Sequence, residues 1–167
     1  MIVVEGPDGT GKSTLINRLH RELKLNLRPR FADSIGGPVE NVFDAMLEDL
    51  NAGVGRDHLY DRYPFISEPI YGTHVRGAYD PRFGNSEMQE ALSFYKPLVI
   101  LCAPNYGTAL ANVESSDQMP GVAENYRKIW EGYYSFMINY PYELFVWDYE
   151  NMDIQTLFNR VGEYINA

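Results

Sequence analysis

The sequence lacks the features that would direct a chain into a membrane or an oxidising compartment. A single cysteine, Cys102, among 167 residues permits no internal disulfide. Because Cys102 lies in the apolar run at 98–103, we expect it to be an inert core residue. No apolar run approaches the roughly twenty residues of a membrane span, and no signal-peptide pattern precedes the first expected strand. We therefore expect a soluble cytoplasmic protein that makes no membrane contact.

Basic residues are also in short supply. The chain has 14 lysines and arginines against 23 aspartates and glutamates, a formal net charge of −9. This balance argues against broad binding of duplex nucleic acid, which needs a basic face, but a nucleotide pocket needs only a few arginines. The three histidines, His20, His58 and His74, have no ligand spacing, so we expect no structural metal.

The most informative stretch is the eight residues GPDGTGKS at positions 6–13, which fill the pattern G-x-x-x-x-G-K-[ST]. An apolar, β-branched run at 1–4 precedes it and predicts a buried strand. Apolar residues follow at helical spacing, so the loop joins a strand to a helix. Such loops cradle phosphates with their backbone N–H groups, and the positive end of the helix faces the same anion. The predicted nucleotide-binding residues are Gly6, Pro7, Asp8, Gly9, Thr10, Gly11, Lys12, Ser13 and Thr14.

Each side chain of this loop has an expected task. Lys12 is predicted to reach the β- and γ-phosphates, and the Ser13 hydroxyl is predicted to bind Mg²⁺. We therefore expect ATP and Mg²⁺ as cofactors. The alternative, a glycine-rich turn that merely enters a helix, does not explain the lysine and serine at their fixed positions.

A second polar group follows the strand expected at 57–60. Asp61 and Arg62 stand where that strand ends, and ligands of open parallel sheets collect at the carboxyl ends of strands. Asp61 is predicted to hold the Mg²⁺ shell or accept a proton, and Arg62 to neutralise a phosphate. The alternative is a surface ion pair between the two.

The segment at 65–77, FISEPIYGTHVRG, is dense in aromatic and polar residues, so we expect a pocket wall more than a smooth helix. Ser67 and Glu68 are candidates for a sugar hydroxyl, Tyr71 for stacking on a base, and Arg76 for a phosphate. Ordinary packing or surface roles are the alternative for each of them.

Strand and helix patterns alternate along the rest of the chain. We expect strands at 24–31, 98–103 and 144–147, a polar loop at 104–121, and helices at 38–53, 86–95, beyond 121 and at the end. Asn85 or Ser86 caps the second of these helices, and the acidic residues of the first, including Asp49, form a solvated face. This order predicts one α/β domain over 1–167, a three-layer P-loop NTPase fold with a parallel sheet of about five strands flanked by helices.

Two motifs carry a family resemblance. Glu5-Gly6-x-Asp8-Gly9-x-Gly11-Lys12-Ser13-Thr14 and Asp61-Arg62-Tyr63 resemble the thymidylate kinases, in particular a short, phage-type branch. The resemblance implies ATP, Mg²⁺ and often a homodimer. It also implies that Asp8 contacts the acceptor sugar or the metal shell, that Arg62 binds the acceptor phosphate, and that Phe65 or Tyr71 stacks on the base.

One departure from that family concerns charge. Thymidylate kinases carry arginines on a lid after the fourth strand or in the phosphate loop, yet 103–126 contains no lysine or arginine, and the loop position is Gly9. Charge on the transferred phosphoryl group must be met by another cation. The candidates are Arg127, Arg76 and Arg82.

This departure leaves the acceptor open. Our first interpretation is a kinase for a thymidine-type deoxynucleotide such as dTMP. The alternatives are a kinase that phosphorylates 5-hydroxymethyluracil within DNA, as phage relatives of thymidylate kinase do, and a deoxynucleoside kinase. A DNA groove requires Arg28, Arg30, Arg56, Arg76 and Arg82 to converge. A nucleotide-binding switch is less favoured, because the sequence lacks N-K-x-D.

Overall fold

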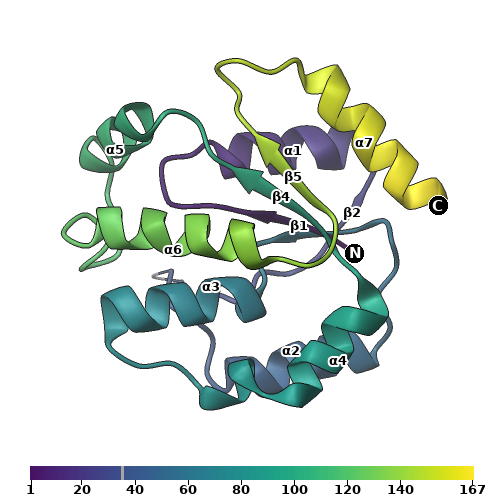
Figure 1. The fold of residues 1–167 in the computed structure, drawn as a ribbon, viewed down its shortest axis with the longest axis horizontal. Coiled ribbons are helices and arrows are strands. Elements are labelled where there is room, and N and C mark those ends of the chain that lie inside the picture. The colour runs from purple at the N-terminus through teal and green to yellow at the C-terminus, as the bar shows by residue number, and fades with distance from the viewer. Residues whose placement is uncertain (35) are drawn as a thin grey trace.

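The computed structural model describes residues 1–34 and 36–167 and contains one five-stranded parallel sheet (Figure 1). The strand order is β2-β3-β1-β4-β5, so the first strand occupies the centre. All four neighbouring pairs are parallel, as expected when helices connect the strands. The strands are β1 (Ile2–Glu5), β2 (Asn26–Leu27), β3 (His58–Asp61), β4 (Leu98–Cys102) and β5 (Leu144–Trp147).

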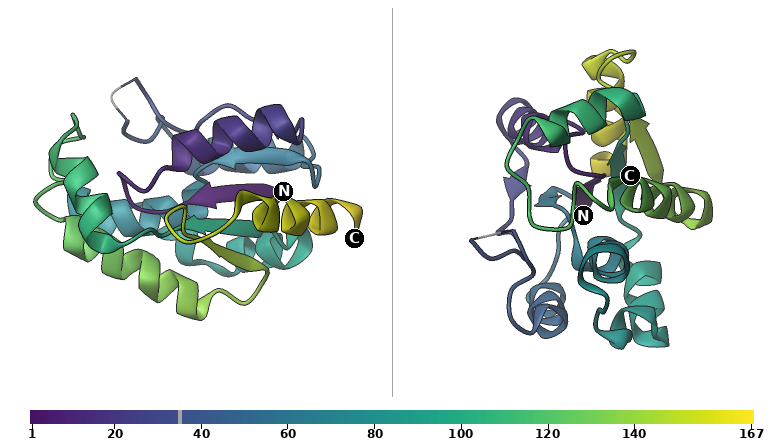
Figure 2. Two further views of the ribbon diagram at one scale, coloured as in Figure 1. Left: turned by 90° about the horizontal axis from the view of Figure 1, so that it is seen from above. Right: turned by 90° about the vertical axis from the view of Figure 1, so that its left-hand side faces the viewer.

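Helices cover both faces of the sheet, which makes three layers (Figure 2). Alternate residues of β1 face opposite layers: Val3 packs with α2, α3 and α6, whereas Ile2 and Val4 pack with α1 and α7. The continuous apolar runs of β1 and β4 follow from this burial on both sides. The helices are α1 (Lys12–Glu22), α2 (Val42–Asn51), α3 (Pro64–Tyr71), α4 (Ser86–Tyr95), α5 (Tyr106–Glu114), α6 (Tyr126–Asn139) and α7 (Ile154–Asn166).

The predicted fold class is confirmed, and several boundaries are corrected. β2 is only two residues long and ends before Pro29, which cannot continue a ladder. The helix expected at 38–53 begins later, at Val42, because Pro38 instead forms a bridge with Ala32. Asn85 does cap α4, accepting a hydrogen bond from the backbone N–H of Met88 at 3.1 Å. The buried thiol of Cys102 is a core residue, as expected.

Two segments predicted as irregular are helical. The polar stretch 104–121 contains α5, which is capped by Asn105 and weakly amphipathic, so its pattern was missed. The stretch 65–77 forms α3 followed by a π-helical turn at Gly72–Arg76, despite Pro69 inside the helix. Within the described residues, no helix is long and apolar enough to cross a membrane.

Candidate active site

The phosphate loop follows β1 at the centre of the sheet and enters α1, as the sequence predicts. Three of its glycines have positive φ angles. Gly9 also has no room for a side chain, since a Cβ atom there would lie 2.5 Å from the carbonyl oxygen of Ala109 in α5. The loop borders a cavity of about 300 Å³, here called the donor cavity, which is lined by Asp8, Gly9, Thr10, Gly11, Lys12, Ser13, Thr14, Arg30, Asp61, Arg62, Asn112, Ser116 and Gln118.

Lys12 lies inside the loop, where its ammonium group donates a hydrogen bond to the carbonyl oxygen of Pro7. Thr10 donates to the same oxygen at 2.7 Å. Burial, reinforced by the positive charge of Arg62, lowers the pKa of Lys12 to about 8. Lys12 lines the donor cavity, whereas Gly6 and Pro7 belong to the loop but do not line the cavity.

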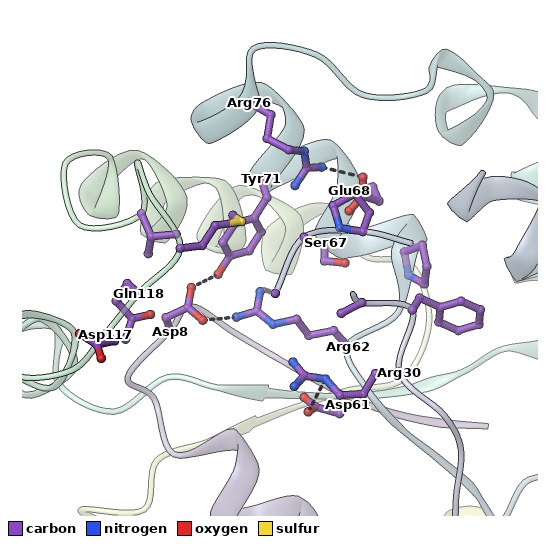
Figure 3. A pocket seen from close by; sticks show the side chains of 18 residues that line it. Asp8, Arg30, Asp61, Arg62, Ser67, Glu68, Tyr71, Arg76, Asp117 and Gln118 are labelled. Atoms are coloured by element: carbon purple, nitrogen blue, oxygen red, sulfur yellow. Dashed lines mark hydrogen bonds and ion pairs between the residues drawn. The ribbon is translucent and has the colours of Figure 1, made fainter. Parts of the chain in front are cut away.

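A second cavity of about 250 Å³, here called the acceptor cavity, adjoins the first. Figure 3 shows the side chains around it. The two cavities share the side chains of Asp8, Arg30, Asp61, Arg62 and Gln118. Asp8, in the loop after β1, and Asp61 and Arg62, where β3 ends, therefore stand at the junction of the two cavities.

Arg62 is held at this junction by contacts on several sides. Its backbone is left-handed, at φ 66°, and its N–H donates to the carbonyl oxygen of Val4 at 3.0 Å. Its guanidinium group donates to Asp8 Oδ1 at 2.8 Å and to the Tyr133 hydroxyl at 3.1 Å, and lies 4.6 Å from the centre of the Tyr71 ring. Strained backbone of this kind is common at functional sites.

Asp8 and Glu5 complete the buried part of the network. The Tyr71 hydroxyl donates to Asp8 Oδ2 at 2.6 Å. Although burial opposes ionisation, Arg62 and Lys12 lower the pKa of Asp8, so it stays charged. Glu5 is fully buried and accepts from the Tyr133 hydroxyl and the Tyr63 backbone N–H, each at 2.8 Å. Burial raises the pKa of Glu5. Glu5 therefore holds the backbone next to Arg62 in place through these hydrogen bonds, and it lines neither cavity.

The residues expected to bind magnesium, Ser13 and Asp61, both line the donor cavity. Asp61 is paired with Arg30, whose Nε lies 3.1 Å from Asp61 Oδ2. Mg²⁺ prefers oxygen ligands and takes few from the protein when it also binds phosphates, so one hydroxyl and one carboxylate fit it. Within the described residues, no cluster of three or more His, Cys, Asp or Glu side chains suits a metal.

At the other end of the acceptor cavity, α3 and the π-helical turn contribute Glu68 and Arg76. These residues line the acceptor cavity only. The guanidinium of Arg76 lies 2.6 Å from Glu68 Oε2. Burial raises the pKa of Glu68, and the charge of Arg76 partly offsets this shift. Ser67 lines the same wall.

Two expected substrate-binding residues lie elsewhere. Phe65 is buried in the core, with its ring 5.6 Å from that of Tyr63, and it lines neither cavity because α3 turns it toward α4. Arg127 projects into solvent from α6, where it pairs with Glu131 at 2.9 Å. The structure therefore places neither Phe65, the candidate for base stacking, nor Arg127, the candidate for substrate binding, on the two cavities.

The arginines considered for a DNA groove do not converge. Arg30 and Arg76 line the acceptor cavity. The others pair elsewhere: Arg28 with Asp49, Arg56 with the carbonyl oxygen of Tyr164, and Arg82 with Asp44 and Asp80.

Sequence reasoning missed several residues of this site. Arg30 and Gln118 line both cavities, although Arg30 lies in the strand expected at 24–31 and Gln118 in the polar loop expected at 104–121. Tyr133 lies in the helix expected beyond 121, and nothing in that helical pattern indicates its contact with Arg62. Asp49, expected on a solvated face, accepts hydrogen bonds from Tyr60 and Tyr63 at 2.7 and 3.3 Å. The long gaps in sequence between these partners leave no local signal.

α5 packs directly on the phosphate loop and closes one side of the donor cavity. The side chain of Asn112 donates to the carbonyl oxygen of Gly9 at 2.9 Å. Glu150, in the loop after β5, accepts from the Asn105 backbone N–H and the Thr108 hydroxyl, each at 2.8 Å. This side of the donor cavity carries no lysine or arginine between residues 103 and 126.

Comparisons with known proteins agree with this architecture. The chain matches no family model and no curated protein. It is similar in structure to YorR protein from Bacillus subtilis in complex with phosphorylated GDP, with 18% identity over 99% of this chain and 95% of that chain and a TM-score of 0.71. It is also similar to deoxyadenosine kinase from M. mycoides with bound dCTP and with bound dATP. Identity there is 18%, coverage 99% of both chains, and the TM-scores are 0.56 and 0.57. At this identity the likeness shows the fold alone, a three-layer α/β domain with a five-stranded parallel sheet.

Proposed function

We propose that the protein is an ATP- and Mg²⁺-dependent phosphotransferase that phosphorylates a thymidine-type deoxynucleotide. The observation that carries this proposal is the shared wall of the two cavities, where Asp8, Asp61 and Arg62 stand between the phosphate loop and a second polar pocket. A cavity of this size next to a phosphate loop suits a small acceptor molecule. The nucleotides bound by YorR protein and by deoxyadenosine kinase, which share the fold, add support.

The site residues divide the reaction between them. The loop N–H groups and Lys12 hold the β- and γ-phosphates, and Ser13 and Asp61 would hold Mg²⁺, which neutralises phosphate charge when bound. The acceptor oxygen forms a bond to the γ-phosphorus as the bond to the bridging β-oxygen breaks, and ADP leaves. Arg62, aimed at the junction, neutralises charge on the acceptor phosphate or the group in transfer.

In the free protein, each arginine at the junction is paired with a carboxylate, Arg62 with Asp8 and Arg30 with Asp61. Mg²⁺ would compete with the arginines for the carboxylates, and phosphates would compete with the carboxylates for the arginines. Binding of both substrates would therefore exchange each ion pair for a carboxylate–metal contact and an arginine–phosphate contact, without leaving any buried charge unpaired.

A second candidate is phosphorylation of the hydroxymethyl group of 5-hydroxymethyluracil in DNA. It is favoured by the absence of lysine and arginine from 103–126, since a hydroxyl acceptor needs no arginine for a second phosphate. The dispersal of Arg28, Arg56 and Arg82 counts against a DNA groove, so the free nucleotide remains the first choice.

The test is a transfer assay with γ-labelled ATP. Each deoxynucleoside monophosphate, each deoxynucleoside, and DNA containing thymine or 5-hydroxymethyluracil are offered in parallel, with and without Mg²⁺. Label on dTMP, lost with Lys12→Ala, is the expected result. Label on DNA alone, or on nucleosides alone, would replace the proposed acceptor, and no transfer to any of them would refute the kinase assignment.

A further inference from the structure

The ion pair at the inner end of the acceptor cavity is unexplained by phosphate transfer. Glu68 is 8% exposed, so its carboxylate has little access to bulk water except through the cavity that it lines. Burying a carboxylate is costly unless it is paired, and Arg76 supplies the partner at 2.6 Å. An apolar pair would fill the same space at lower cost, so this pair calls for a role in binding.

The local backbone is built to present this pair. Arg76 ends the π-helical turn that extends α3, and such turns are frequent at functional sites. Gly72, which begins the turn, packs so closely that a Cβ atom would lie 2.4 Å from Cβ of Tyr79 and 2.8 Å from the carbonyl oxygen of Ala78. This close packing fixes the turn that carries Arg76, eight residues after Glu68 of α3.

The placement of the pair separates it from the chemistry. Glu68 and Arg76 border the acceptor cavity alone, whereas Asp8, Asp61 and Arg62 border both cavities. In Figure 3 the Arg62–Asp8 pair lies between the Arg76–Glu68 pair and the Arg30–Asp61 pair. An acceptor whose reacting oxygen lies at the junction therefore extends its other end toward Glu68 and Arg76.

We propose that Glu68 and Arg76 read the base of the acceptor nucleotide by binding a ring N–H and the carbonyl beside it. Ionised carboxylates only accept hydrogen bonds, and guanidinium groups only donate them. Thymine, uracil and guanine present a ring N–H next to a carbonyl oxygen. Adenine and cytosine instead present a ring nitrogen without a proton, and the donor beside it is their exocyclic amino group. A carboxylate placed to accept from a ring N–H would therefore face the lone pair of that ring nitrogen. This inference rests on the proposed function and names the class of acceptor base within it.

This assignment differs from the roles that the sequence suggests for the two residues, a sugar hydroxyl for Glu68 and a phosphate for Arg76. The sugar and phosphate belong near the junction, where Asp8 and Arg62 stand. With Arg76 engaged by Glu68, a phosphate at this end would also face a carboxylate and be repelled by it.

The experiment compares base preference in wild-type protein and in Glu68→Gln and Arg76→Ala variants. The acceptors are dTMP, dUMP, dGMP, dAMP and dCMP. Their kcat/KM values are measured with labelled ATP, and their binding without ATP is measured by calorimetry. Wild-type protein is expected to favour the three acceptors with a ring N–H next to a carbonyl, dTMP, dUMP and dGMP, by about tenfold or more over dAMP and dCMP.

Both variants are expected to reduce this preference by about tenfold, mainly through KM, with ATP binding unchanged. The matched controls are Glu131→Gln and Arg127→Ala, which disrupt an arginine–glutamate pair of the same kind on the exposed surface of α6. These controls are expected to keep the wild-type ranking of acceptors.

Three outcomes would overturn the proposal. They are a wild-type preference for dAMP or dCMP, an unchanged ranking of bases in folded Glu68→Gln protein, and equal losses for all five acceptors. If the Glu68→Gln and Arg76→Ala variants keep Lys12-dependent transfer and the wild-type ranking of acceptors, the base-reading role of the pair is refuted and the proposed function is not. Absence of both transfer and nucleotide binding in wild-type protein refutes the proposed function, and the base-reading pair with it.

Discussion

The two cavities that meet at Asp8 and Arg62 differ in which parts of the chain line them. The donor cavity is formed largely by consecutive residues of one loop, whose three glycines have positive φ angles. The acceptor cavity is formed by side chains from well-separated segments of the chain, and these include three arginine–carboxylate pairs. The pairs of Arg62 with Asp8 and of Arg30 with Asp61 border both cavities, whereas the pair of Arg76 with Glu68 borders the acceptor cavity alone.

This difference has consequences for function. Backbone groups cannot be removed by substitution, so donor binding depends on a few side chains and on the shape of the loop. Side-chain pairs can be altered one partner at a time, so specificity in the acceptor cavity can change by substitution, with a cost to stability where the remaining partner is buried. Substitutions in the two regions are therefore expected to have different kinetic signatures.

The largest effect is expected for Lys12→Ala. Lys12 is the loop cation that we propose holds the phosphates, and removing one preorganised charge at a transferred group costs roughly 10²–10³-fold in rate. We expect transfer to every acceptor to fall by at least this factor, while circular dichroism and the melting temperature show a folded protein. Near-normal turnover in folded Lys12→Ala protein would mean that the loop does not serve catalysis.

Arg62→Lys is expected to separate the two cavities kinetically. Lysine keeps the charge but cannot contact Asp8 and Tyr133 together as the guanidinium does. We expect kcat/KM for a monophosphate acceptor to fall by roughly 10²-fold and for a nucleoside acceptor by much less, with the Kd of a non-hydrolysable ATP analogue unchanged. Equal losses for both acceptors would show that Arg62 does not bind the acceptor phosphate.

The same contrast explains how much the sequence could predict. The donor side was predictable because strand, loop and helix are contiguous, and the strand-end pair Asp61-Arg62 because parallel strands end at one edge. The acceptor side depends on encounters such as Arg30 with Asp61 and Tyr133 with Arg62, across 31 and 71 residues. The core position of Phe65 depends on which way α3 faces its neighbours, and that orientation is set by tertiary packing.

Gly9→Ala tests whether the shape of the donor cavity depends on contact with α5. A methyl group there would meet the carbonyl oxygen of Ala109 at 2.5 Å, at a positive φ of 74°. The expected cost is about 1 kcal/mol for the backbone and a further 1–3 kcal/mol for the collision, with about tenfold weaker ATP binding as α5 moves away.

Gly53→Ala is the matched control for this prediction, because Gly53 also has a positive φ, of 92°, but has nothing within 4 Å of a Cβ atom. It should show the backbone cost alone and bind ATP normally. If the two variants lose the same stability in chemical denaturation, the packing of α5 on Gly9 contributes nothing.

The smallest predicted effect is a pH dependence that belongs to the donor cavity alone. The pKa of Lys12 is lowered from 10.5 to about 8 by burial and by Arg62, with Asp8 and Asp61 opposing the shift. Because phosphates bind the charged form, we expect the affinity for ATP to fall severalfold as the pH rises from 7 to 9, measured by calorimetry.

The burial of Lys12 also makes the folded protein release this proton at a lower pH than the unfolded chain does. Burying the charged Lys12 therefore lowers the free energy of unfolding by its full amount below about pH 8, and this loss disappears as the pH rises from 8 to 10.5. Denaturation of wild-type and Lys12→Ala protein across this range should show wild-type stability rising relative to the variant. A constant difference between the two would mean that Lys12 keeps its ordinary pKa and that the loop is less preformed than its geometry indicates.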